Sequence, residues 1–336
     1  MTAERKPELD GPQRELLARF SEGETLALSR AISLVENQRT GFEALLHALH
    51  DRLGGARRIG ITGPPGAGKS TLTAGLARRY RDAGETVGVI AVDPSSPFTG
   101  GALLGDRIRM NDLATEPGIF IRSMASRGSH GGLSATTREA TDLMDAFGFS
   151  RVLLETVGVG QSELEIAAQA DTTVVVLVPE SGDGIQAMKA GLMEVADLFV
   201  VNKADRPGAE RLRSEIRVVN HLREEPNGSV GEAAWDPPIL MTVASTGEGL
   251  DELVEQLDLH HASLESGGDL AQRRRGAALK HTRMVLERAV GRRVAGAWAH
   301  EIESRGDPLS GGESPYEVAR RVADDLCPPT ADDAGP

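Results

Sequence analysis

Short runs of β-branched and aliphatic residues alternate along the chain with longer stretches in which apolar residues recur every three or four positions. Runs that are apolar throughout are typical of parallel strands, because helices cover both faces of such a sheet. The strand-like runs lie at 58–62, 87–92, 151–154, 173–178, 198–201 and 238–242. Their alternation with helical patterns predicts an α/β fold, with a mostly parallel sheet flanked by helices.

Helical patterns also extend the chain beyond both ends of this alternating region. Apolar residues recur at helical spacing over 16–53 and again over 270–303, after a break at Ser266–Gly268. The apolar face of the second stretch belongs either to the core of this chain or to a contact with a second copy. We expect an N-terminal helical extension over 1–56, a central α/β domain over 57–262, and a C-terminal helical segment over 263–336 with a frayed tail.

A glycine-rich loop stands between the first predicted strand and the helix that follows it. The loop reads GPPGAGKS and matches the phosphate-binding pattern G-x-x-x-x-G-K-[ST]. Its glycines let backbone N–H groups face phosphate oxygens, Lys69 can reach the β- and γ-phosphates, and the Ser70 hydroxyl can bind Mg²⁺. The order strand, loop, helix argues against a simple Gly-Pro surface turn. We therefore predict a P-loop NTPase whose phosphate site comprises Gly63, Pro64, Pro65, Gly66, Ala67, Gly68, Lys69, Ser70 and Thr71.

A second motif, Asn202-Lys203-Ala204-Asp205, follows the strand-like run 198–201 and matches N-K-x-D, the guanine-reading motif of GTPases. The Asp205 carboxylate can accept two hydrogen bonds from guanine, and adenine does not offer that pair of donors. A carboxylate left unpaired by the wrong base is costly, so such a site discriminates strongly. We expect Asn202 to fix the loop and approach the base edge, and the stem of Lys203 to cover one ring face.

Carboxylates at the ends of two other predicted strands are candidate ligands of Mg²⁺. Asp93 and Glu155 each follow a strand-like run, which places them at the carboxyl edge of a parallel sheet. Glu155 to Gly158 has the spacing of the D-x-x-G switch, with Glu for Asp, so Gly158 can donate its N–H to the γ-phosphate. Asp106 is either a metal or switch residue or the cap of a helix. The predicted metal ligands are Ser70, Asp93, Asp106 and Glu155.

The residue that should orient the attacking water is missing from its usual place. Small GTPases carry a glutamine directly after the switch glycine, and here that position is Val159. Valine cannot orient water, and Gln161 can substitute only after a rearrangement. We therefore expect slow hydrolysis unless a partner reshapes the site, with Lys69, Glu155, Gly158 and Gln161 as the catalytic set.

Longer strings make the chain resemble the MeaB/ArgK GTPases, the G-protein chaperones of methylmalonyl-CoA mutase and related cobalamin-dependent mutases. These strings are VDPSSP at 92–97, GGALLGDR at 100–107, ETVGVGQSE at 155–163 and DGIQAMKAG at 183–191. The resemblance implies a Mg²⁺-dependent GTPase that gates adenosylcobalamin loading or protection of an acyl-CoA mutase. It also implies a cobalamin adenosyltransferase as a further partner, and homodimerisation through the segment after Leu270.

The same resemblance bears on two loops. Residues 180–189 resemble an additional switch segment, although an ordinary loop is an equally good interpretation for any single residue there. The base site would be completed by Val243, Ala244 and Ser245. The family pattern has Ser-Ala where this chain has Val243-Ala244, so Ala244 can still direct its N–H at guanine but a supporting hydroxyl is lost.

Two other function classes share parts of this pattern. A nickel-insertion GTPase of hydrogenase or urease maturation has the same fold class, but it normally displays Cys/His clusters that this sequence lacks. His47 and His50 are spaced for a shared metal but no third ligand is visible. A kinase of a transport-binding protein is implied by the older ArgK name, and the guanine-specific Asp205 argues against it.

The composition of the chain limits its expected partners and location. With 336 residues and 40% hydrophobic content, the chain can bury a large core. A net charge of −13 argues against nucleic acid as a partner, because phosphates are neutralised by clustered cations. No run reaches membrane-spanning length and the first ten residues are charged, so we expect no membrane partner, no signal peptide and a cytoplasmic protein. The single cysteine, Cys327, excludes an internal disulfide.

The guanine motif predicts that Asp205→Asn changes base preference. An amide in place of the carboxylate can donate to the extra carbonyl oxygen of xanthine, so affinity should move from guanine to xanthine nucleotides. Titration calorimetry of both proteins with GTP, XTP and ATP measures this shift. Equal affinity of the unmodified protein for ATP and GTP would show that the motif does not read the base.

Overall fold

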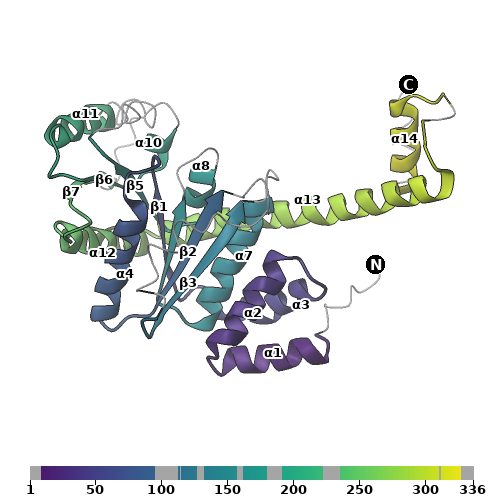
Figure 1. The fold of residues 1–336 in the computed structure, drawn as a ribbon, viewed down its shortest axis with the longest axis horizontal. Coiled ribbons are helices and arrows are strands. Elements are labelled where there is room, and N and C mark those ends of the chain that lie inside the picture. The colour runs from purple at the N-terminus through teal and green to yellow at the C-terminus, as the bar shows by residue number, and fades with distance from the viewer. Residues whose placement is uncertain are drawn as a thin grey trace. The chain divides into compact units, whose positions relative to one another are not determined.

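The computed structural model describes residues 9–94, 113, 115–126, 132–156, 162–179, 191–221, 235–309 and 312–326. The chain forms two compact units, Met1–Ala277 and Ala278–Pro336. The first unit holds the sheet and its covering helices, and the second holds most of one long helix and a shorter one (Figure 1).

A seven-stranded sheet in the order β3-β2-β4-β1-β5-β6-β7 forms the centre of the first unit. Its strand pairs are all parallel, which confirms the predicted α/β fold. The strands are β1 Arg57–Thr62, β2 Val87–Pro94, β3 Ile119–Ser126, β4 Arg151–Thr156, β5 Thr172–Leu177, β6 Leu198–Asn202 and β7 Ile239–Thr242. The sequence pattern predicted all of these except β3, an edge strand whose apolar run is interrupted by Arg122 and Ser123.

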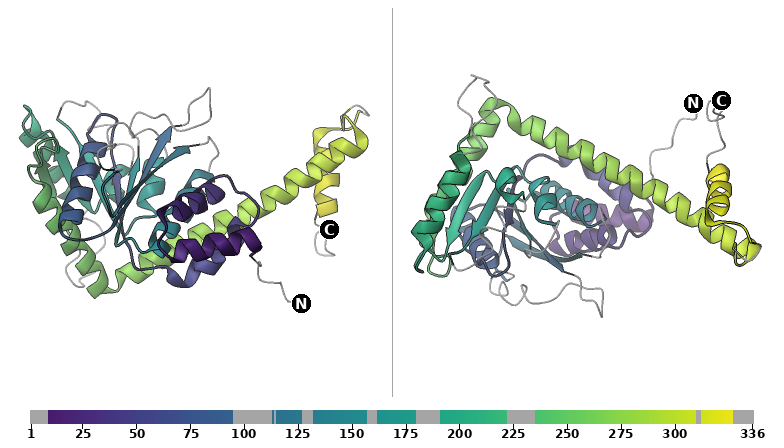
Figure 2. Two further views of the ribbon diagram at one scale, coloured as in Figure 1. Left: turned by 60° about the horizontal axis from the view of Figure 1, so that its bottom comes forward. Right: turned by 90° about the horizontal axis from the view of Figure 1, so that it is seen from above.

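Helices cover both faces of the sheet (Figure 1, Figure 2). Alternate residues of one strand enter different cores: Val87 and Val89 pack with α4 and α12, whereas Ile90 and Val92 pack on the side of α7. A third core joins β5 and β6 to α10 and α11. The bounds are α4 Lys69–Asp82, α7 Gly132–Phe147, α8 Ser162–Ala167, α10 Leu192–Val195, α11 Ala209–His221 and α12 Leu250–Gly267. These helices and the sheet confirm the predicted P-loop NTPase architecture.

The predicted N-terminal extension is a group of helices packed on α7. It comprises α1 Gly11–Ser21, α2 Thr25–Glu36, α3 Phe42–Leu49 and the 3₁₀ turn η1 His50–Arg52. Asp10 and Gln13 form a capping box that starts α1, in which each side chain accepts from the backbone N–H of the other residue. Arg122 of β3 pairs with Glu36 at the end of α2 and so joins this group to the sheet edge.

One buried carboxylate holds the junction between the extension and β1. Asp145 of α7, whose side chain is 0% exposed, accepts from the N–H groups of Gly54, Gly55 and Ala56 at 2.9, 3.0 and 2.9 Å. It also pairs with Arg58 at 2.7 Å. Burial lowers the pKa of the Arg58 guanidinium, but the nearby carboxylates of Asp142 and Asp145 hold it above its ordinary value. The group therefore stays charged inside the protein.

The predicted C-terminal helix is present as α13, Asp269–Arg305, and is followed by α14, Pro315–Leu326. In the second unit Arg321 of α14 pairs with Glu301 of α13 at 2.7 Å, and Val318 and Val322 are buried. Along α13 a row of large apolar side chains remains about half exposed, at Leu286, Val290, Val294, Trp298 and Ile302. Across the described helices, length and hydropathy together fall short of what a membrane crossing would need.

The role of Asp145 predicts that Asp145→Asn is strongly destabilising. The substitution removes one of the two carboxylates that pair with Arg58 and weakens acceptance from three backbone N–H groups, and breaking a buried ion pair costs about 3–5 kcal/mol. Urea unfolding compares this variant with Glu215→Gln, in the exposed Arg211–Glu215 pair, which should stay within about 0.5 kcal/mol of the parent protein. A similarly small loss for Asp145→Asn would refute the assigned role.

Candidate functional site

The predicted phosphate loop lies between β1 and α4, and two of its glycines are required by close contacts. Gly63 has φ +138°, and a Cβ there would lie 2.1 Å from the carbonyl oxygen of Val176 on β5. Gly68 has φ +86°, and a Cβ there would lie 2.4 Å from Nδ2 of Asn202. Side chains at these positions would push the loop away from β5 and β6. The glycines therefore set the loop directly against the strands beside it.

Lys69 begins α4 and turns its ammonium back into the loop. Its Nζ donates to the carbonyl oxygens of Gly63 and Pro64 at 2.7 and 2.9 Å, and the residue is only 5% exposed. The N-cap, Gly68, has no side chain that could close the helix, so the N–H groups of the first turn can donate to an anion. The cation and the positive end of the helix thus lie together.

Two side-chain oxygens that could bind a metal, one from α4 and one from β4, lie close together beside Lys69. Ser70 Oγ donates to Glu155 Oε1 at 2.6 Å, and both residues are buried. Glu155 lies on β4 in register with Ile61 of β1, so the carboxylate reaches the phosphate loop from the neighbouring strand. Hydroxyl and carboxylate oxygens are ligands that suit Mg²⁺. The structure thus brings together two of the four predicted metal ligands.

The other predicted switch and metal residues are less fully described. Asp93 has its backbone in β2, one residue beyond the paired positions Val92 and Thr156, and its side chain lies outside the described part of the structure. Asp106, Gly158 and Gln161 lie outside the described residues, as does the segment 180–190. The roles expected of these residues stay predictions.

Asn202 connects the phosphate loop to the loop that follows β7. Its Nδ2 donates to the carbonyl oxygen of Ala67 at 2.8 Å. Its Oδ1 accepts from the N–H of Ala244 at 3.0 Å and from Thr242 Oγ1 at 3.2 Å. With 2% exposure and three such bonds, Asn202 fixes the loops, and its approach to the base edge stays a prediction. Likewise the N–H that we expected Ala244 to direct at guanine is donated to Asn202 here.

The rest of the N-K-x-D motif forms a tight turn at the end of β6. Lys203 adopts φ +58°. The N–H of Ala204 donates to the carbonyl oxygen of Thr242 at 3.0 Å, and the N–H of Arg206 donates to the carbonyl oxygen of Lys203 at 3.0 Å. This turn leaves Asp205 exposed, as is Ser245 on the neighbouring loop. The carboxylate predicted to read guanine is therefore accessible, on a turn that is hydrogen-bonded to the end of β7.

Sequence reasoning overlooked Thr242, whose hydroxyl helps to orient Asn202. Thr242 is 0% exposed and ends β7, so its hydroxyl is held inside the junction between the two loops. A signal was present: a hydroxyl at the end of an otherwise apolar strand needs a hydrogen-bond partner once it is buried.

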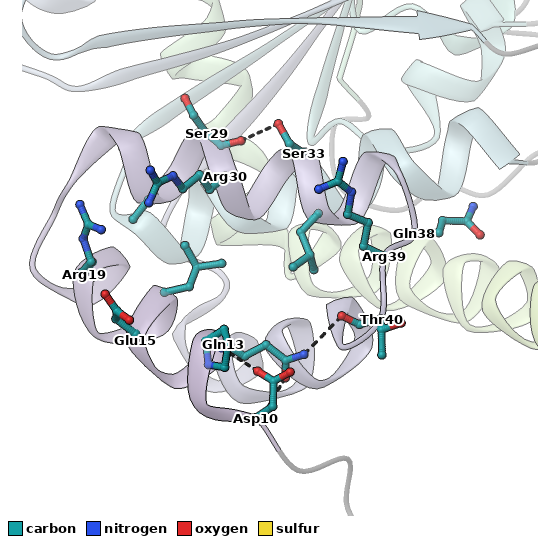
Figure 3. Close-up of a pocket in the computed structure, with 14 residues that line it drawn as sticks. Asp10, Gln13, Glu15, Arg19, Ser29, Arg30, Ser33, Gln38, Arg39 and Thr40 are labelled. Atoms are coloured by element: carbon teal, nitrogen blue, oxygen red, sulfur yellow. Dashed lines mark hydrogen bonds between the residues drawn. The ribbon is translucent and has the colours of Figure 1, made fainter.

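A separate groove of about 1030 Å³ lies between α1 and α2 (Figure 3). Its lining comes from residues 10–40, so it is distinct from the phosphate loop, and its charged groups have both signs: Asp10, Glu15, Arg19, Arg30 and Arg39. Among the described residues, no three or more His, Cys, Asp or Glu side chains are grouped as a metal site.

The chain is similar in sequence to several known proteins. A family model described as methylmalonyl-CoA mutase-associated GTPase MeaB matches residues 28–299. A Pyrococcus horikoshii protein, provisionally named a GTPase, is 44% identical over 315 residues, which are 94% of this chain and 98% of that protein. The mouse protein named methylmalonic aciduria type A homolog, mitochondrial, is 34% identical over 270 residues, 75% of this chain and 64% of its own length.

One solved structure is similar over nearly the whole chain. The crystal structure of an LAO/AO transport system kinase has a TM-score of 0.68 and 29% sequence identity. The match covers 95% of this chain and 99% of that one.

The position of Lys69 predicts that Lys69→Met weakens triphosphate binding without unfolding the protein. Loss of a charge-assisted hydrogen bond to phosphate should reduce GTP affinity roughly 10- to 100-fold. Methionine retains most of the buried aliphatic volume, so the circular-dichroism spectrum should stay native. GTP affinity is measured by titration calorimetry, and an unchanged affinity in a native protein would place the phosphate site elsewhere.

Proposed function

Because the chain belongs to the MeaB family of GTPases, we propose that it is a Mg²⁺-dependent GTPase that acts as a G-protein chaperone. In this role it gates adenosylcobalamin loading or protection of an acyl-CoA mutase. The observation that carries the nucleotide part of the proposal is the junction at Asn202. There Asn202 of the N-K-x-D motif is hydrogen-bonded to the G-x-x-x-x-G-K-S loop at 2.8 Å and to the loop after β7 at 3.0 Å.

The nucleotide would lie across this junction. Lys69 would exchange its bonds to the loop carbonyls for bonds to the phosphates, because charged oxygens are stronger acceptors than peptide oxygens. At the other end Asp205, now exposed, would accept two hydrogen bonds from guanine and become buried. An adenine there would leave the buried carboxylate unpaired, which supports selectivity for GTP.

Ser70 and Glu155 are the described residues that fit a Mg²⁺ ion. Their oxygens are 2.6 Å apart, buried, and adjacent to the phosphate loop. When bound, the ion neutralises charge on the phosphate oxygens. The Ser70 hydroxyl would bind the ion directly, and Glu155 would hold a water of its coordination shell. Asp93 and Asp106 are proposed as additional ligands.

Hydrolysis would be slow in the isolated protein. Val159 stands where small GTPases have a water-orienting glutamine, so the chain lacks that group in its usual place. We propose that Gly158 binds the γ-phosphate and that a partner brings Gln161 into position. A GTPase of this kind is suited to timing an interaction.

A cobalamin-dependent acyl-CoA mutase is the proposed partner. The family description and the mouse relative's name both refer to methylmalonyl metabolism, which supports this class of enzyme. A cobalamin adenosyltransferase is proposed as a second partner. The row of half-exposed apolar residues on α13, including Leu286, Val290 and Trp298, supports homodimerisation through this helix.

A kinase acting on a transport-binding protein is the alternative, because the protein with the similar solved structure is named a transport system kinase. Asp205 disfavours an ATP-dependent kinase, because its carboxylate pairs with guanine. Nickel insertion has less support, since the chain contains a single cysteine.

A mutase partner should accelerate GTP hydrolysis. Supplying missing transition-state groups raises turnover roughly 10³- to 10⁵-fold in assisted GTPases, so a cognate mutase should raise the single-turnover rate by a large factor. If the mutase binds the GTP-state switches better, it should by linkage be held more tightly in the state with a non-hydrolysable GTP analogue than in the GDP state.

Single-turnover hydrolysis is measured with and without the mutase, and incubation with the binding protein of a transport system serves as the test for phosphotransfer. Fast hydrolysis that no mutase alters, with mutase affinity independent of the nucleotide, would contradict the chaperone role. A labelled transport protein would favour the kinase.

A further inference from the structure

The loop after β7 is held in shape by its own hydrogen bonds. The N–H of Val243 donates to the carbonyl oxygen of Glu248 at 3.0 Å, and the N–H groups of Thr246 and Gly247 both donate to that of Val243 at 3.0 Å. Gly249 ends the loop at φ +76°, where a Cβ would lie 2.1 Å from the carbonyl oxygen of Met241. The loop is thus a closed turn, held by three backbone hydrogen bonds of its own.

Asn202 fixes the first part of this turn, and Arg79 fixes its tip. Arg79 lies on α4, the helix that begins at Lys69, and its Nη2 donates to the carbonyl oxygen of Gly247 at 2.9 Å. Its Nε donates to Asp251 Oδ1 at 2.5 Å in the first turn of α12, and its Nη1 to the carbonyl oxygen of Gly75 at 3.4 Å. One guanidinium therefore joins α4, the loop and α12.

The packing around Arg79 shows that this contact is built into the fold. Gly75 lets α4 and α12 approach closely, because a Cβ there would lie 2.5 Å from Leu250 Cδ1. Gly247 has φ +86°, and a Cβ there would lie 3.1 Å from Arg79 Nη2. The Asp251 side chain is 89% exposed, so its ion pair adds little. The charge-assisted bond to the Gly247 carbonyl is the stronger restraint on the loop.

We propose that Arg79 is a positioning residue for guanine recognition. It acts through the 243–249 loop, which borders the accessible Asp205 turn, and so determines how the base is held. Because α4 also carries Lys69 and Ser70 at its other end, one rigid helix sets the distance between the phosphate site and the base loop. The proposal rests on the proposed guanine specificity and adds a residue to it.

The expected signature is a loss of base selectivity. Arg79→Met keeps the aliphatic stem but removes the donors, so the affinities for GDP and GTP should fall by the same factor, about tenfold. ADP affinity should not change, because ADP depends on the phosphate loop alone. Arg79→Lys, which retains a cation, should lose less affinity for GDP and GTP. Arg78 is exposed on the same helix, so Arg78→Met should bind all three nucleotides as the parent protein does.

Competition titrations of the full chain with GDP, GTP and ADP provide the measurement, and thermal melting reports folding separately. If both Arg79 variants melt at a lower temperature but keep the same ratio of GDP affinity to ADP affinity, the residue is merely structural and the proposal is overturned. If the parent protein binds GDP no better than ADP, the proposed guanine specificity is wrong, and the role proposed for Arg79 is wrong with it. A reduced ratio in Arg79→Met with partial rescue in Arg79→Lys supports the proposal.

Discussion

The amide of Asn202 is the contact on which the nucleotide site depends. One side chain donates to the carbonyl oxygen of Ala67 in the phosphate loop and accepts from the N–H of Ala244 in the base loop. Because the residue is buried at the end of β6, neither loop can move without breaking a hydrogen bond that water would not readily replace. In the proposed function, the two ends of a nucleotide would therefore be recognised at a fixed separation.

Charged pairs stabilise the other ends of the strands, where β1, β5 and β6 begin. Asp171 accepts from the N–H of Arg58 at 3.0 Å and pairs with Arg274 of α13 at 2.7 Å. Burial raises the pKa of Asp197, but the nearby His260 and the hydrogen-bonded guanidinium of Arg273 hold it below its ordinary value. Arg273 and Arg274, in the first turns of α13, pair with these two buried carboxylates. The glycine-rich phosphate loop lies at the other, carboxyl ends of the strands, where we propose that the nucleotide binds.

Elements that are encoded by consecutive residues could be predicted from the sequence. The buried strands, the phosphate loop and the N-K-x-D turn follow from short runs of residues, so their positions could be predicted from the sequence. Contacts between distant segments could not be predicted in this way. Neither the pairing of Asp145 with residues 54–58 nor the bond from Arg79 to Gly247 leaves a spacing signal, because the partners are separated by 87 to 91 and 168 positions. The engaged Ala244 N–H was missed for the same reason.

A crystal structure of the chain with Mg²⁺ and a non-hydrolysable GTP analogue tests the central claim, that Asn202 joins two loops into one guanine-nucleotide site. The account predicts phosphates in the 63–70 loop, with Lys69 Nζ moved from the Gly63 and Pro64 carbonyls onto them. It also predicts the guanine edge on Asp205 and all three Asn202 hydrogen bonds preserved. A base that lies away from Asp205, or a nucleotide bound with the Asn202 bonds to Ala67 and Ala244 broken, would contradict it.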